Sequence, residues 1–186
     1  MRTKKVLAWE IAGMFFIIII GSLLHFTYEL SGFWKPASLI SAVNESTWEH
    51  LKIGFWPALI FLIIEFFVLR KETKNFILAK TVSLYLIPIV ITGLFYSYTA
   101  ILGRDIFFLD ISIFVISIIV AQIVSYRLML LKSAHKTASL TALIFLTIEI
   151  VAFSFLSYFP PHFFLFKDPV TGGYGLTRYV LFLKIT

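Results

Sequence analysis

Two short stretches of the chain hold side chains that can bind a metal ion or move a proton. His25 and Glu29 are four residues apart, and Glu45 and Glu49 have the same spacing, with His50 next in the chain. Side chains four residues apart lie on one face of a helix. Neutral imidazoles and carboxylates are ligands of zinc and other divalent ions. The same groups can also work without a metal, with a carboxylate as base and a histidine as proton shuttle.

Both stretches adjoin long apolar segments. The chain has 186 residues, of which 60% are hydrophobic and 14% charged, and its mean hydropathy is +0.95. A soluble domain cannot bury that much apolar surface, which predicts an integral membrane protein. The sequence contains no cysteine, so disulfides, iron–sulfur clusters and thiol nucleophiles are excluded.

Five apolar segments are long enough to cross a bilayer as helices of about 20 residues. We predict a single all-helical transmembrane domain over residues 1–186, with spans at about 6–28, 48–69, 79–101, 106–126 and 138–159. Residues 160–186 contain paired prolines, paired glycines and only a short apolar run that charges interrupt. We therefore expect this segment to form a tail that does not span the membrane.

The distribution of Lys and Arg predicts the orientation of the five spans, because cytoplasmic loops carry an excess of these residues. The side that includes the N-terminus has ten basic residues against three acidic ones, whereas the other side has as many acids as bases. The basic residues are Arg2, Lys4, Lys5, Arg70, Lys71, Lys74, Lys80, Arg127, Lys132 and Lys136, and the acids are Glu10, Glu65 and Glu72. The N-terminus is therefore predicted inside and the tail outside. The net charge of +6 then reflects topology, and we expect no binding of nucleic acid.

In this topology His25, Glu29, Glu45, Glu49 and His50 all fall on the outer face, at the facing ends of the first two helices. The connection between these helices is short, so their ends are expected to be neighbours. We predict that the five residues form a site for a divalent metal such as zinc, with Glu49 and His50 as catalytic residues. An ion with an open coordination position acidifies a bound water or polarises a carbonyl or phosphoryl oxygen.

Two structural interpretations of the same stretch stay open. Ser46 and Glu49 have the spacing of a capping box, which would satisfy two backbone amides at the start of the second span. Asn44, Glu45 and Ser46 also form a glycosylation sequon on the predicted outer side.

Glu149 lies near the middle of the fifth span, where an acidic residue costs about 2.5 to 3.5 kcal/mol. We expect it to face the bundle, either protonated and hydrogen-bonded to Thr92, Tyr96 or Ser117, or in a cavity or proton path.

Glu65 lies within about one turn of the inner end of the second span. We expect it to pair with a cation of the inner face, such as Arg127 or Arg70.

The tail has two further candidates, His162 and Asp168. The stretch "KDPVTGGYG" is rich in turn residues and is expected to bend tightly. It either folds back as a lid that brings His162 or Asp168 over the outer site, or lies in the headgroups as an interfacial strip.

Several strings together resemble a family of unknown function, made up of small polytopic membrane proteins from bacteria and archaea. They are "HFTYELSG", "VNESTWEHLK" with "FWP" shortly after it, and "FPPH…LFKDPVTGGYG". The resemblance implies a multi-pass protein of a prokaryotic plasma membrane, which argues against glycosylation of Asn44 unless the source is archaeal. It implies no activity, so none is carried over.

The function predicted from the residues is metal-assisted hydrolysis or group transfer on a lipid or lipid-linked substrate at the outer interface. One alternative is binding or transport of a small polar solute, with Glu149 on its route. Another is an accessory protein whose polar face docks a membrane partner. The expected partners are the lipid bilayer and a lipid or small-molecule ligand.

Overall fold

The protein is a bundle of five long helices in a computed structural model that describes residues 2–132 and 134–176. Each helix is apolar and long enough to cross a membrane, which confirms the predicted five-helix, all-α architecture. The shortest has 20 residues, or about 30 Å of helix. The helices are α1 (Arg2–Leu30), α2 (Thr47–Leu69), α3 (Phe76–Leu102), α4 (Phe107–Leu130) and α5 (Lys136–Phe155), and two short 3-10 helices are η1 (Lys35–Leu39) and η2 (Phe164–Phe166).

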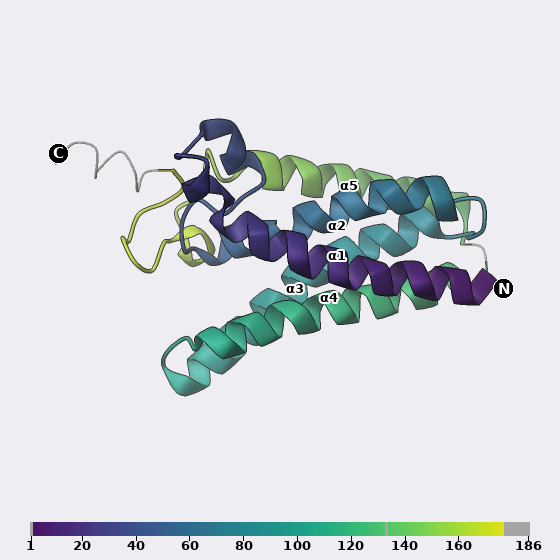
Figure 1. Cartoon of the computed structure of the whole chain (residues 1–186), viewed down its shortest axis with the longest axis horizontal. Coiled ribbons are helices and arrows are strands. Elements are labelled where there is room, and N and C mark those ends of the chain that lie inside the picture. The colour runs from purple at the N-terminus through teal and green to yellow at the C-terminus, as the bar shows by residue number, and fades with distance from the viewer. Residues whose placement is uncertain (1, 133, 177–186) are drawn as a thin grey trace.

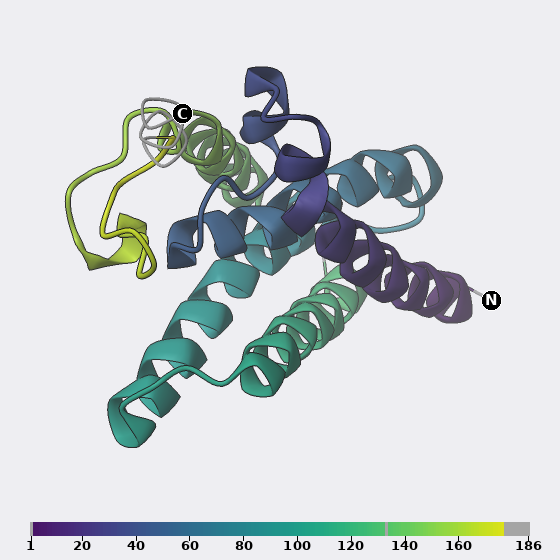
Figure 2. The same cartoon turned by 60° about the vertical axis from the view of Figure 1, so that its left-hand side comes forward.

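The helices run up and down, so their connections gather at two ends of the bundle (Figure 1). We call the end formed by residues 31–46, 103–106 and 156–176 the outer end, and the end formed by residues 70–75 and 131–135 the inner end. The α3–α4 connection projects away from the other two outer connections in both views (Figure 2). Residues 31–46 and 156–176 therefore form one cap over the outer ends of α1, α2 and α5.

Helix α2 is the most buried of the five helices. Helix α1 packs on α2 and α4, and α3 packs on α2, α4 and α5. Large apolar side chains such as Phe15, Phe67 and Ile101 remain exposed on the outside of the bundle. A bilayer would solvate these side chains, so the exposed apolar surface is consistent with membrane insertion.

A column of four aromatic rings attaches the tail to the outer end. Phe166 of η2 stacks on Trp48 with ring centroids 4.7 Å apart, and Trp48 stacks on Phe153 of α5 at 4.6 Å. Phe153 in turn stacks on Phe55 of α2 at 4.5 Å. Phe166 is buried although it lies outside the five spans. The tail is therefore held by ring packing, which adds to the burial of apolar area.

Gly21 sits where α1 closely approaches α2. A Cβ at this position would lie 2.7 Å from the backbone oxygen of Ile53 and 2.8 Å from Cζ of Phe114. Pro57 lies inside α2 and has no N–H, so the Ile53 oxygen four residues earlier has no helical donor. The close approach of α1 is possible because residue 21 has no side chain.

We predict that Gly21→Ala lowers the free energy of unfolding by about 1 to 2 kcal/mol, because a backbone atom cannot move aside for the new methyl group. Gly93→Ala in α3 is the matched control, since a Cβ there meets nothing within 4 Å. The control should be neutral or stabilising by up to about 1 kcal/mol from helix propensity. Unfolding in detergent measures both, and equal effects of the two substitutions would contradict the close packing of α1.

Candidate functional site

Three of the five predicted metal ligands lie together at the outer end. His25 is near the end of α1, His50 is in the first turn of α2, and Glu45 precedes α2. The two imidazole centroids are 5.1 Å apart, and Oε2 of Glu45 lies 3.6 Å from Nε2 of His50. One ligand atom from each of the three residues lies within 4.8 Å of the other two. Neither Glu29 nor Glu49 belongs to this group.

The orientation of His50 leaves one ring nitrogen available to a ligand. Nδ1 lies 3.0 Å from the backbone oxygen of Ser46. A carbonyl oxygen can only accept, so the bond requires a proton on Nδ1, and in the neutral ring Nε2 is then the unprotonated nitrogen. Histidines that bind metals commonly donate their second ring N–H to a backbone carbonyl in this way. On His25, Nδ1 is buried and has no hydrogen-bond partner among the described residues.

Three ligands from two helices and a loop suit a catalytic metal better than a purely structural one. Structural zinc sites use four protein ligands, whereas catalytic sites use three and leave one position for water or substrate. Tetrahedral zinc would need ligand atoms about 3.3 Å apart, given bonds of about 2.0 to 2.1 Å. Since the atoms lie within 4.8 Å of one another here, binding requires the ligand atoms to approach by up to about 1.5 Å. Glu45 is exposed and both histidines are half-buried, so none of the three residues is fully enclosed in the core.

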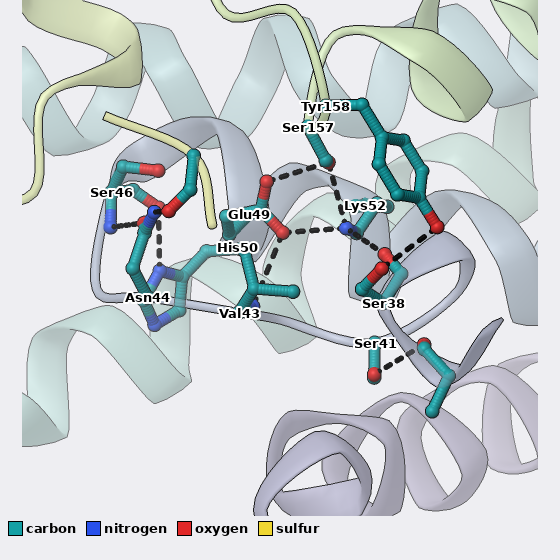
Figure 3. A network of polar contacts seen from close by, with 12 residues as sticks. Ser38, Ser41, Val43, Asn44, Ser46, Glu49, His50, Lys52, Ser157 and Tyr158 are labelled. Carbon is teal, nitrogen blue, oxygen red and sulfur yellow. Dashed lines mark hydrogen bonds and ion pairs between the residues drawn. The ribbon is translucent and has the colours of Figure 1, made fainter. Parts of the chain in front are cut away.

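Glu49, predicted as a ligand and a catalytic residue, occupies a different environment. Its side chain is 1% exposed, and Oε2 forms an ion pair of 2.5 Å with Nζ of the fully buried Lys52. Ser157, which follows α5, donates a 2.6 Å hydrogen bond to Oε1 of Glu49 and accepts one of 2.8 Å from Lys52. Lys52 also donates to the backbone oxygen of Ser38 at 2.7 Å (Figure 3). Glu49 thus contacts the cap and Lys52 and does not take part in the histidine cluster.

The capping-box interpretation of Ser46 and Glu49, one of the two that the sequence left open, is wrong. Ser46 is the N-cap residue of α2, but its side chain makes no capping hydrogen bond. Glu49 accepts instead from the backbone N–H of Val43 at 3.2 Å. The N–H of Ser46 donates to the side chain of Asn44 at 2.8 Å. The start of α2 is therefore stabilised by residues that precede it, with Asn44 in the place where Glu49 was expected.

Asn44 is buried, and its amide donates to the backbone oxygen of Gly175 at 2.9 Å. This bond ties the tail to the segment before α2 (Figure 3). An asparagine whose amide is buried and bonded in the folded protein cannot accept a glycan without undocking the tail. The sequon is thus better explained by this structural bond.

The other predicted candidates near the outer end do not belong to the metal-ligand group. Glu29 is exposed at the end of α1. Asp168 is buried, and its carboxylate accepts from the N–H of Val170 and the hydroxyl of Thr171, so it shapes its own turn. His162 is exposed and stacks on Tyr174, with ring centroids 4.4 Å apart. Neither His162 nor Asp168 belongs to the metal-ligand group. The ion pair of Glu49 is bound by Ser157, which precedes the tail.

Glu149 is buried in α5, as predicted, but lacks the predicted partners. Neither of its carboxylate oxygens has a hydrogen-bond partner within the part of the chain that the structure describes. The hydroxyl of Tyr96 bonds Thr47 at 3.0 Å, and Ser117 donates to the backbone oxygen of Phe114 at 2.7 Å. Tyr85 of α3 donates to the backbone oxygen of Phe145, one turn before Glu149, at 2.8 Å. The carboxyl group therefore lies at the α3–α5 contact, where no described residue donates a hydrogen bond to it.

Glu65 pairs with a cation of the set assigned to the inner face, as predicted, but this cation is neither Arg127 nor Arg70. Its partner is Lys80 of α3, which also binds Glu10 of α1. All three side chains are buried, so they are part of the bundle interior and not of the inner surface. Without them, the set of residues assigned to the cytoplasmic side still holds nine basic residues against one acid, Glu72, which strengthens the charge asymmetry behind the predicted orientation.

Sequence reasoning missed Lys52, Ser157, Glu10 and Lys80 as parts of buried polar networks. Glu49 and Lys52 are three residues apart, a spacing at which opposite charges meet on a helix, so this pair had a signal in the sequence. No such signal exists for Glu10 and Lys80, which are separated by 70 residues.

The fold and the site together define a polytopic membrane protein of five helices with a polar cluster at its outer end. The chain belongs to a family of unknown function, DUF6512, whose family model matches residues 1–176. The predicted membership of a family without known activity is thereby confirmed. No curated protein and no solved structure matches the chain.

Proposed function

We propose that the protein is a metal-dependent enzyme of a prokaryotic plasma membrane, which hydrolyses or transfers a group of a lipid-type substrate at the outer interface. His25, Glu45 and His50 hold the ion, and zinc suits two imidazoles and a carboxylate. The observation that carries the proposal is the convergence of three ligand atoms within 4.8 Å of one another from α1, α2 and the residues before α2.

The surroundings of the cluster support a substrate that comes from the lipid phase. Leu23, Phe26 and Leu30 lie on α1 beside His25, and all three are exposed. Apolar side chains of this kind contact acyl chains in a bilayer, while the ligand residues sit near the helix ends at headgroup depth. An ion held there can polarise a carbonyl or phosphoryl oxygen of a lipid headgroup, and its open position can supply an acidified water.

The proposal predicts that detergent-purified protein retains about one equivalent of zinc after excess metal is removed. His50→Ala and His25→Ala should each lose this equivalent, because two remaining ligands do not hold zinc against dilution. His135→Ala is the matched control, since His135 is an exposed histidine at the inner end that contacts Thr137. Elemental analysis measures the stoichiometry. Chelation should lower the melting temperature of the wild type and of His135→Ala, but not that of His50→Ala or His25→Ala.

Zinc-loaded protein should then release product from phospholipid vesicles, and His50→Ala should not. Wild-type protein that binds no zinc, or a His50→Ala variant that binds it as tightly as the control, would contradict the metal site. Tight zinc binding without turnover of ester or phosphodiester lipids would support the metal site and contradict the enzymatic activity.

A further inference from the structure

A second polar cluster lies inside the bundle, towards the inner end, and none of its contacts reaches the proposed metal site. Its charged members are Glu10 of α1, Glu65 of α2 and Lys80 of α3, with exposed fractions of 1%, 0% and 3%. Helix α4 contributes the buried Ser125 and Gln122, which are uncharged. Four of the five helices therefore meet at this cluster.

Lys80 binds both carboxylates. Its Nζ donates to Oε1 and Oε2 of Glu10 at 2.9 and 3.0 Å and forms an ion pair with Oε2 of Glu65. Ser125 donates a further hydrogen bond of 2.8 Å to Oε1 of Glu10. Oε1 of Glu65 is buried and has no hydrogen-bond partner in the described part of the chain. The carboxylate of Glu10 thus has donors for both of its oxygens, whereas that of Glu65 has one oxygen without a donor among the described residues.

The charges of this cluster do not balance. Two carboxylates carry two negative charges, and Lys80 supplies one positive charge. The charged groups that face Glu65 are Glu10 from α1 and Lys80 from α3, while α4 presents only Ser125 and Gln122. An uncompensated charge in a membrane interior is strongly disfavoured, so one more positive charge is needed.

Tight packing around the cluster favours a proton over a hydrated metal ion. Gly13 lies one turn from Glu10 on α1, and a Cβ there would come within 2.2 Å of Nε2 of Gln122. The same amide nitrogen donates to the backbone oxygen of Glu10 at 3.3 Å. Helices α1 and α4 are therefore in close contact beside the cluster, and a hydrated cation would need them to separate.

We propose that the Glu10–Lys80–Glu65 cluster is an intramembrane proton-binding site, in which Glu65 carries one exchangeable proton at neutral pH. Oε1 of Glu65 accepts a proton from a hydronium ion at the inner end, which leaves water and a neutral carboxylic acid, while Glu10 stays ionised and bound to Lys80. This site is independent of the proposed metal site, and its test does not depend on that proposal.

Exchange with the inner side follows from the position of the cluster along the helices. Glu65 lies four residues before the end of α2, and Lys80 lies four residues after the start of α3. Four residues correspond to about 6 Å of helix. A small separation of the helix ends at residues 70–75 would bring water to the carboxyl group.

Infrared spectroscopy of the full-length protein in lipid at neutral pH tests the proposal. The wild type minus Glu65→Gln difference spectrum should contain the carbonyl band of one protonated carboxylic acid, and this band should shift in D2O. Glu149→Gln should leave the band in place, which separates it from any signal of that buried acid. Glu72→Gln is the control for an ordinary glutamate, since Glu72 is partly exposed and paired with Lys5.

Glu10→Gln gives a second, independent readout and keeps the test decisive if Glu65→Gln does not fold. With Glu10 neutral, Lys80 alone balances Glu65, so Glu65 should ionise and the same band should disappear. Persistence of the band in Glu10→Gln, or its absence from the wild type, would overturn the proposal. So would a band that does not shift in D2O, which would indicate a sealed proton, and a band that sodium chloride abolishes and choline chloride does not, which would indicate a sodium site.

Discussion

Lys52→Met is expected to lower the free energy of unfolding by about 3 to 5 kcal/mol, which is the cost of leaving one member of a buried ion pair alone. Among the described residues, Glu49 would keep only the hydrogen bonds from Ser157 and Val43, and none of them would give its 1% exposed carboxylate a counter-ion. The loss should also loosen the cap, because Lys52 binds Ser38 and Ser157 on its two sides. Unfolding in detergent measures the energy, and proteolysis of residues 156–176 measures the loosening.

A double substitution distinguishes the ion pair from simple packing. Lys52→Met combined with Glu49→Leu removes both charges, and a buried pair replaced by apolar residues is often neutral or stabilising. The double variant should therefore be more stable than Lys52→Met alone, with a coupling energy visible in the double-mutant cycle. Lys5→Met is the control for an exposed pair, since Lys5 and Glu72 are both partly exposed, and it should cost less than about 1 kcal/mol. Equal costs for Lys52→Met and Lys5→Met would contradict the importance of burial.

The helices could be predicted from sequence because a membrane span needs only length and apolar composition. Their ends could not. The fourth span was expected to end near residue 126, but α4 continues to Leu130, and the fifth was expected to reach residue 159, but α5 ends at Phe155. Hydropathy reports where the bilayer ends, whereas a helix continues until its backbone bonds find other partners.

The predicted metal site is divided because Glu45 and Glu49 point in different directions, and the spacing of the two residues does not reveal this. Glu45 and Glu49 are four residues apart, but α2 begins at Thr47, so helical periodicity does not apply to Glu45. Glu45 therefore turns towards His50, while Glu49 turns into the core. Which way each side chain points depends on the path of residues 31–46 and on Ser157, which lies 108 residues after Glu49. A single sequence does not contain that contact.

Glu149→Leu is expected to raise the free energy of unfolding by about 2 to 3 kcal/mol, the opposite of the usual effect of a buried substitution. The carboxyl group is buried in α5, and the described residues offer neither oxygen a hydrogen bond. A leucine of similar volume keeps the contact with α3 and removes the cost of desolvating a polar group. Unfolding of wild type and variant in the same detergent measures the difference.

Glu149→Gln separates polarity from charge, because an amide in the same place is also unpartnered and should gain little. Thr147→Leu on the same helix is the control, since Thr147 is exposed and donates to the backbone oxygen of Leu143. A gain confined to Glu149→Leu would mean that the fold bears a buried acid that contributes nothing to its stability, and such groups concentrate at functional positions. A loss of more than about 1 kcal/mol would instead indicate that the carboxyl group has a partner within the membrane.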